Sequence, residues 1–189
     1  MASEPPVEYI ERQQWLEPLE TGVQNAVAKA FESGGETGQK VKDALHGKWL
    51  GHALHPALTD VPIGAWTATL VLDLMEASGR RDVRAGADVT LAVGLAGAGM
   101  AALAGITDWH EMEGKPRRVG LAHGMLNIVS AGLYTASMVA RSKRNRAAGR
   151  YLALAGFSIS MVSAYLGGSL VFGEAAPQNG NSGDAGQPA

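Results

Sequence analysis

The sequence predicts an all-α integral membrane protein: an up-and-down bundle of four membrane helices preceded by a short N-terminal amphipathic helical region. Mean hydropathy over the 189 residues is zero, but the apolar residues concentrate between positions 57 and 173. Four segments there reach the roughly 20 residues that an α-helix needs to cross a bilayer. They are about 57–77, 87–107, 120–140 and 151–173. A soluble bundle of buried helices is the alternative, but four largely uncharged cores joined by short basic loops favour the membrane.

Residues 1–45 predict a helical region outside the membrane. Pro18 suits the first turn of a helix. Apolar residues then recur at helical spacing until Ser33, Gly34 and Gly35 end the pattern, and a second short helix is expected over 37–46. The first helix could lie on the membrane surface or on a partner, or pack against the mouth of the bundle. Its polar face is acidic rather than basic, which favours packing against the bundle.

The remaining features set limits on function. The chain has no cysteine, which excludes disulfides, thiolate metal sites and a cysteine-ligated iron–sulfur cluster within it. Its start, Met1 to Glu4, has no basic residue and no apolar run follows, so we expect no cleavable signal peptide. Residues 174–189 are rich in Gly, Asn, Gln and Pro and are expected to be disordered. No internal repeat is evident.

Loop charges predict the orientation in a bacterial plasma (inner) membrane. The loops after the first and third spans contain eight basic residues: Arg80, Arg81, Arg84, Arg141, Lys143, Arg144, Arg146 and Arg150. The loop after the second span contains three, Lys115, Arg117 and Arg118, together with three acidic residues. Lys and Arg accumulate on the cytoplasmic side. Both termini are therefore expected outside the cytoplasm.

Four histidines lie near the span ends expected at that extracytoplasmic face: His52, His55, His110 and His123. Imidazole is a common ligand for haem iron, zinc and copper, and helical bundles hold cofactors with side chains from facing helices. His123 is the best candidate because Asn127, Ser130 and Tyr134 continue its helix face as a polar stripe. His55, beside Pro56 at a helix start, is next. For His46 and His52 we favour a simple interfacial position.

Several motifs together resemble a bacterial membrane-protein family known as domain of unknown function 2231. The stretch from His46 to Trp66, HGKWLGHALHPALTDVPIGAW, looks like its signature, and the resemblance covers residues 45–172. Further matches are Asp73, the run Gly105 to Trp109, the run Gly120 to His123 and the run Tyr165 to Gly168. The resemblance implies a four-helix membrane protein.

The same resemblance suggests an electron-transfer setting, because many members continue into a Rieske iron–sulfur domain. This chain departs from that pattern after Phe172, where it runs through Gly173 to Pro177 without cysteines. Ser169 stands where members often carry histidine. A Rieske-type partner would therefore be a separate chain.

Two kinds of cofactor fit the histidines. One b-type haem needs two axial histidines, small residues beside the ring and cations for its propionates. Those small residues and cations could be Gly64, Gly105, Gly120, Gly124, Lys115, Arg117 and Arg118. The glycines could equally let helices pack closely, as rows of small residues do in lipid. A transition metal could instead use the histidines with Asp60, Asp108 or Glu111, although no compact metal motif is present.

Asp73 lies about one turn from the expected cytoplasmic interface. A carboxylate there could serve a proton or ion relay, but pairing with Arg80 or Arg81, or snorkelling, is favoured. The leading hypothesis is a small accessory redox protein that holds one haem, or meets quinol and a Rieske-type partner, at the histidine site. The alternatives are a non-catalytic scaffold or assembly factor and a metal-binding or ion-translocating protein. No enzyme motif and no nucleic-acid partner is indicated, and a homo-oligomer in membrane lipid stays open.

Overall fold

Four long helices pack side by side in the computed structural model, which describes residues 6–172. They are α4 (Leu54–Ala77), α5 (Arg84–Trp109), α6 (Gly114–Ser142) and α7 (Arg146–Phe172). Each contains one of the predicted spans within the described range and begins three to six residues before it. No strand occurs in residues 6–172. The expected disorder of 174–189 concerns residues outside this range.

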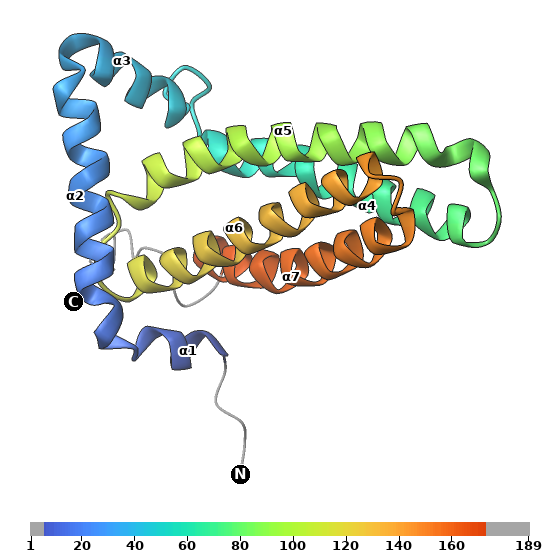
Figure 1. Ribbon diagram of the computed structural model, residues 1–189. Coiled ribbons are helices and arrows are strands. Elements are labelled where there is room, and N and C mark those ends of the chain that lie inside the picture. The colour runs from blue at the N-terminus through green and yellow to red at the C-terminus, as the bar shows by residue number, and fades with distance from the viewer. Residues whose placement is uncertain (1–5, 173–189) are drawn as a thin grey trace, which may run out of the picture.

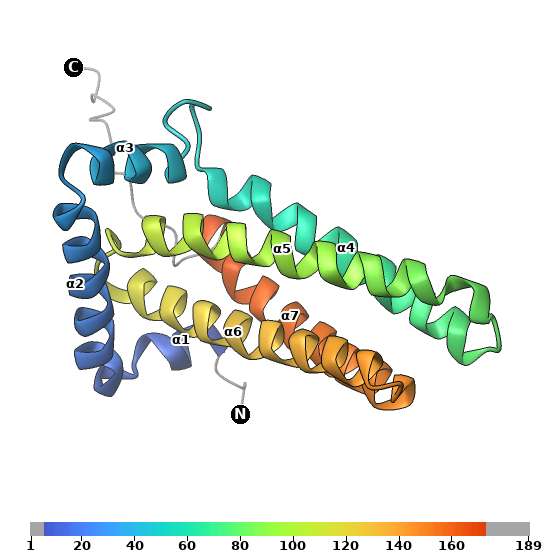
Figure 2. The same ribbon diagram turned by 45° about the horizontal axis from the view of Figure 1, so that its top comes forward.

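The helices are arranged as two antiparallel hairpins, α4 with α5 and α6 with α7 (Figures 1 and 2). Short connections join the members of each hairpin at one end of the bundle, and the α5–α6 connection lies at the other end. Three of the helices, α4, α5 and α7, are long and apolar enough to cross a membrane. Helix α6 does not meet the same criterion, so length and composition support three of the four predicted spans.

Glycines on α5 let α4 approach closely. A Cβ added to Gly94 would lie 2.2 Å from Nε1 of Trp66, and one added to Gly97 would lie 2.6 Å from Cγ1 of Val61. Small residues on α5 therefore let these two helices pack closely, as they do in other helices that associate in lipid.

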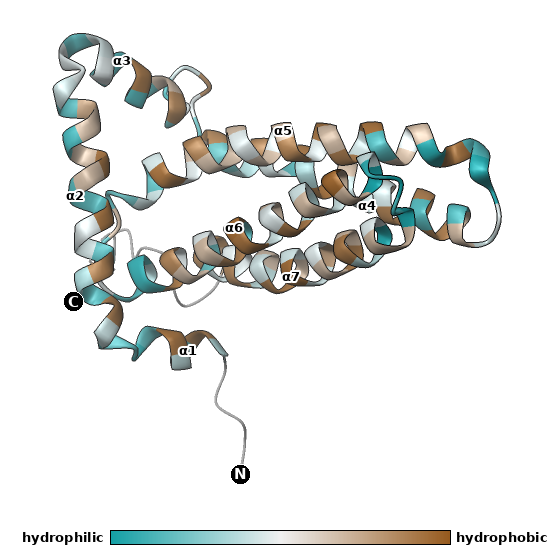
Figure 3. Ribbon diagram, in the orientation of Figure 1, coloured by the Kyte–Doolittle hydropathy of each residue, from teal (hydrophilic) through white to brown (hydrophobic). Residues whose placement is uncertain are grey.

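The bundle is apolar outside and partly polar inside. Large apolar side chains point outward: Val71 is 51% exposed, Val93 47% and Ile128 74%. Figure 3 shows apolar residues along all four helices and hydrophilic ones at the connections. The wholly buried side chains include small hydroxyls: Thr69, Thr107, Ser130, Ser137 and Ser163. Helices that associate in lipid show this distribution, because contacts between small and polar residues hold them together there.

The N-terminal helices cover one end of the bundle. They are α1 (Pro6–Glu11), α2 (Glu17–Ser33) and α3 (Gly35–Leu45), with a 3-10 turn at Gln14–Leu16. Helix α2 crosses the end of the bundle nearly at right angles to the long helices (Figure 1). Helices α2 and α3 occupy the segments for which the sequence predicted helices. Helix α1 was not predicted, because six residues are too few to show a helical period.

Glu20 and Gln24 fasten α2 to the bundle. The fully buried carboxylate of Glu20 accepts hydrogen bonds from Arg117 and Arg118 at 2.9–3.2 Å. Gln24 donates to the carbonyl oxygen of Met112 at 2.9 Å. Helix α2 therefore packs against the mouth of the bundle.

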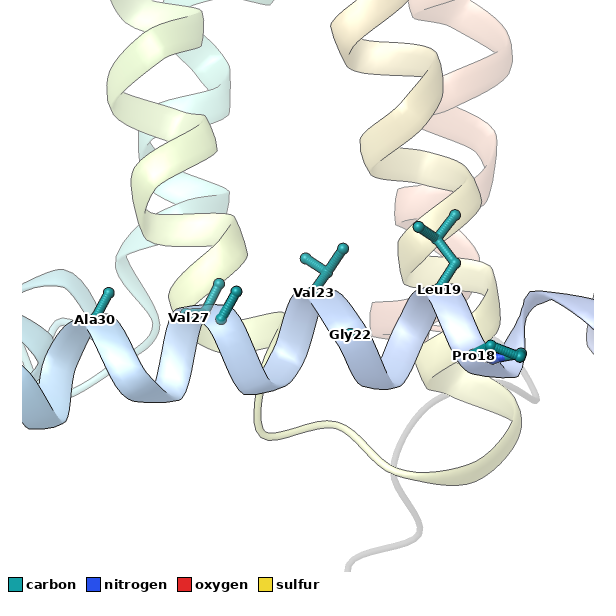
Figure 4. Close-up of a pocket in the computed structure, with 7 residues that line it drawn as sticks. Pro18, Leu19, Gly22, Val23, Val27 and Ala30 are labelled. Carbon is teal, nitrogen blue, oxygen red and sulfur yellow. The ribbon is translucent and has the colours of Figure 1, made fainter.

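The apolar stripe of α2 faces the bundle. Leu19, Val23 and Val27 point from α2 toward the ends of the long helices (Figure 4). They line an open hollow of about 430 Å³.

Candidate functional site

A stripe of polar side chains runs along the inward face of α6. It comprises His123, Asn127, Ser130, Tyr134, Ser137 and Arg141. Successive members are four or three residues apart, which keeps them on one side of an α-helix. Ser130, Tyr134 and Ser137 are at most 1% exposed, and Arg141 is 7% exposed. Apolar residues occupy the opposite face of α6, so the bundle encloses a polar line that follows its axis.

His55 and His123 meet at the end of this line that α2 covers. Their ring centroids are 6.2 Å apart, with an interplanar angle of 83°. Nδ1 of His55 donates to the carbonyl oxygen of Ala101 at 2.8 Å. Nδ1 of His123 donates to the carbonyl oxygen of Ser163 at 2.8 Å, and Asn127 donates to its Nε2 at 3.0 Å. Each imidazole is thus held by the partner helix of its own hairpin.

These contacts do not support haem at the histidine pair. Both ring nitrogens of His123 have hydrogen-bond partners within the protein. A Cβ at Gly105 would lie 2.8 Å from the His55 ring, and one at Gly167 would lie 2.9 Å from the His123 ring. The helix backbones therefore pack directly against the imidazole rings. Gly120, another residue expected beside a haem, packs against Trp109.

The cations expected to bind haem propionates have other partners. Arg117 and Arg118 bind Glu20, and Lys115 lies 3.0 Å from Glu11. They hold the N-terminal helices in place, which explains the basic residues of this loop without a cofactor.

His46 and His110 form a second pair, outside the long helical core. Their rings stack at a centroid distance of 6.3 Å. Nδ1 of His46 lies 2.8 Å from Asp108 and its Nε2 lies 3.2 Å from Glu111. Nδ1 of His110 donates to the carbonyl oxygen of Thr107, so neither acidic neighbour orients His110 through that nitrogen. A hydrogen bond from Lys42 lowers the pKa of Glu111 below its ordinary value.

The other proposed ligands lie apart. His52 and Asp60 are exposed, and neither belongs to either histidine pair. Within residues 6–172, no three His, Asp or Glu side chains are grouped so that they could hold a metal ion.

A network of charged side chains, most of them buried, lies at the opposite end of the bundle. Arg141 binds Asp73 on α4 and Asp88 on α5, the latter at 3.2 Å. Arg146 binds Glu76 at 2.8 Å and Asp88 at 2.9 Å. Asp73, Glu76 and Arg141 are each less than 8% exposed. These ion pairs join α6 and α7 of the second hairpin to α4 and α5 of the first.

The expected partner of Asp73 was wrong. Arg80 instead pairs with Asp82 at 2.9 Å, and Asp73 pairs with Arg141. Asp73 lies on the inward face of α4, so its side chain points to the bundle axis rather than back to its own loop. Extending the spacing of His123, Asn127, Ser130 and Tyr134 by three and then four residues leads to Ser137 and Arg141, a signal in the sequence that was missed.

An aromatic pair lies between the two ends. Trp66 of α4 and Tyr134 of α6 stack at a centroid distance of 4.0 Å and an interplanar angle of 15°. Nε1 of Trp66, the hydroxyl of Tyr134 and Oδ1 of Asp73 are buried and lack hydrogen-bond partners in the described part of the chain. Along its axis the bundle therefore has three layers: the His55–His123 pair, the Trp66–Tyr134 pair and the Asp73–Arg141 pair.

Long apolar helices, exposed apolar flanks and a polar interior define a helical membrane protein. The chain belongs to the family described as "Predicted membrane protein (DUF2231)", whose family model matches residues 51–176. This confirms the resemblance seen in the sequence. Comparisons with curated proteins and with solved structures each found no match.

Proposed function

We propose that the bundle transfers protons across the membrane along the inward face of α6. The observation that supports this function best is the buried polar stripe from His123 to Arg141. Polar and ionisable side chains inside a membrane domain cost free energy, and those that are kept there usually serve ions, protons or substrates. This function belongs to the ion-translocating class, and it uses the histidines without requiring a haem or metal.

Transfer across the membrane requires α6 to be the fourth span. Helix α6 is 29 residues long, enough to cross about 30 Å of hydrocarbon. Its composition is less apolar than that of its neighbours because its inward face carries the polar stripe. Its outward residues are apolar and exposed, including Met125 (48%), Ile128 (74%) and Val139 (46%). We therefore include α6 with α4, α5 and α7 in a bacterial inner membrane.

At the histidine end, the imidazole nitrogens can accept and donate protons. Because Nδ1 of His55 donates to Ala101, its Nε2 carries the lone pair that accepts a proton. The neighbouring His123 is linked through Asn127 to the start of the stripe. Proton entry is therefore assigned to this pair.

His123 is hydrogen-bonded to Asn127, and Ser137 to Arg141. Between Asn127 and Ser137, successive members of the stripe are separated by a helical rise of about 4.5–6 Å, and within residues 6–172 no direct hydrogen bond joins them. Water molecules between the hydroxyls would complete the chain. The partnerless polar atoms of Trp66, Tyr134 and Asp73 favour hydration of this part of the axis, because buried polar atoms are costly without a partner. At the far end Asp88, whose side chain is 45% exposed, connects the ion pairs to solvent.

The test is proton flux into vesicles that contain the purified full-length protein. A potassium gradient with valinomycin supplies the driving potential, and an enclosed pH-sensitive dye reports the flux. The parent should exceed protein-free vesicles. Tyr134→Phe keeps the ring that stacks on Trp66 but removes the hydroxyl, so it should reduce flux by about tenfold or more.

The matched control is Tyr151→Phe, which removes a hydroxyl from a side chain that is 74% exposed. Its flux should equal that of the parent. Flux at the protein-free level for the parent, or equal flux for Tyr134→Phe and the parent, would contradict proton transfer. Either result would favour the non-catalytic scaffold, in which the buried polar groups only hold the helices together.

A further inference from the structure

The two hairpins bury their residues in the same pattern. Helix α4 buries Pro62, Trp66, Thr69 and Asp73, followed by Glu76 at its end. Beyond its first seven residues, helix α6 buries Ser130, Tyr134, Ser137 and Arg141. Every residue of the second set follows its counterpart by 68 positions, the separation of Asp73 and Arg141.

Helices α5 and α7 repeat the agreement. The buried residues of α7 are Gly149, Ala153, Gly156, Ser163 and Leu166. Each follows a buried residue of α5 by 62 positions; the counterparts are Ala87, Leu91, Gly94, Ala101 and Ala104. Helix α5 buries Thr107 and Trp109 in addition, at the end that contacts the N-terminal helices.

Individual contacts are repeated as well. In the first hairpin, His55 donates to Ala101 and its ring lies on Gly105. In the second, His123 donates to Ser163 and its ring lies on Gly167. These residues keep the separations of 68 and 62.

The aromatic layer follows the same rule. Trp66 lies on Gly94, and Tyr134 lies on Gly156. An aromatic ring on the first helix of each hairpin therefore fills the space that a glycine leaves on the second.

The sequence carries a weak trace of this equivalence. Seven aligned pairs of α4 and α6 are identical: His55/His123, Leu58/Leu126, Val61/Val129, Gly64/Gly132, Thr67/Thr135, Ala68/Ala136 and Val71/Val139. Between equivalent positions the second hairpin is six residues shorter than the first, the difference between the separations of 68 and 62, so no single separation aligns both helices. That difference explains why no internal repeat is evident in the sequence.

We infer that residues 54–109 and 114–172 are two copies of one hairpin unit, and that opposite charges at equivalent positions make the unlike copies pair. Equivalent residues meet across the bundle axis in all three layers: His55 with His123, Trp66 with Tyr134, and Asp73 with Arg141. The two hairpins are therefore related by an approximate two-fold axis that runs along the bundle. The inference is independent of proton transfer.

The charges show which copies fit together. Asp73 of the first copy corresponds to Arg141 of the second, and Asp88 corresponds to Arg150. If two identical hairpins paired by the same contacts, Asp73 would face Asp73, or Arg141 would face Arg141. Like charges in a buried site repel strongly. The network at this end therefore selects the pairing of α4–α5 with α6–α7 over self-association of either hairpin.

The test exchanges the charges in the full-length protein. Asp73→Arg and Arg141→Asp each place like charges together and should reduce the yield of monodisperse protein in mild detergent by about tenfold or more. All the charge variants are made in an Asp88→Asn background, because Asp88 lies 3.2 Å from Arg141 and would repel an aspartate at that position. The double exchange then restores opposite charges at positions 73 and 141, and its yield should return to within about twofold of Asp88→Asn alone. Exchanging the exposed pair Arg80 and Asp82 is the control, and it should have no effect.

A second exchange tests equivalence without charge. Trp66→Tyr combined with Tyr134→Trp should also assemble, because each ring sits on a glycine of its partner helix. A double charge exchange no better than the single changes, or failure of the aromatic exchange to assemble, would overturn the inference. Neither readout depends on proton flux.

Discussion

Glu20 is the residue on which the attachment of the N-terminal helices most depends. Its side chain is fully buried and is shared by Arg117 and Arg118, whose side chains are only 17% and 10% exposed. A buried carboxylate between two cations offsets charges that would otherwise be uncompensated. No comparable contact is made by the exposed Glu17 at the start of the same helix.

We predict that Glu20→Gln loosens α2 from the bundle, because the amide keeps the size of the side chain but leaves both arginines without a counter-charge. Breaking a buried pair costs about 3–5 kcal/mol. Backbone amide exchange over residues 17–33, measured by mass spectrometry, should accelerate by about a hundredfold relative to the parent. Glu17→Gln should leave exchange unchanged, and unchanged exchange in Glu20→Gln would show that apolar contacts alone hold α2.

At the level of single residues, helix faces could be predicted but partners could not. The stripe from His123 through Tyr134 follows from spacing alone, because α-helical geometry fixes which residues share a face. The partner of Asp73 depends on which helix lies opposite α4, and nothing in the local sequence contains that information. Arg80 and Arg81 were therefore predicted as partners of Asp73 because they are near it in the sequence. Only the folded bundle shows that the partner is Arg141.

The close contact of α4 with α5 depends on glycine at particular positions of α5. At Gly94 the indole of Trp66 occupies the space where a Cβ would be. At Gly99, also in α5, no atom lies within 4 Å of that position. The two glycines therefore differ in packing while sharing a helix.

We predict opposite effects for alanine at these two positions. Gly94→Ala should destabilise the bundle by about 1–3 kcal/mol, because Trp66 must move away from a well-packed site. Gly99→Ala should be neutral or stabilising by up to about 1 kcal/mol, since alanine favours a helix more than glycine does. Thermal unfolding in detergent, followed by circular dichroism, measures both variants; equal midpoints would show that Trp66 moves aside without cost.

The long helices could be predicted as elements because apolar length carries a strong signal. Helix α1 gave no such signal, and the repeat was concealed by connections of different length. Helix α6 shows why composition alone can fail to identify a membrane span. Polar residues on its inward face lower its hydropathy below that of α4, α5 and α7, and the proposed function depends on these same residues.

The two ends of the molecule differ in chemistry. At one end the arginines of α6 and α7 bind acidic residues of α4 and α5. At the other, the histidine pair lies near the N-terminal helices, which tie themselves to the α5–α6 connection through Glu20. Proton transfer across a membrane requires the two ends to face different compartments. The orientation of the whole molecule therefore decides which end faces the cytoplasm.

We predict that Ser33 and Glu113 lie outside the cytoplasm and that Ser78 and Ser142 lie inside it. The excess of basic residues in the loops containing Ser78 and Ser142 is the reason. All four side chains are exposed in the structure and the chain has no native cysteine, so single cysteines can be placed at each position and labelled in intact cells with an impermeant thiol reagent. Cysteines at 33 and 113 should be labelled, and those at 78 and 142 only after the cells are opened. Labelling of position 142 together with 113 in intact cells would mean that α6 does not cross the membrane, and labelling of 78 and 142 alone would invert the orientation.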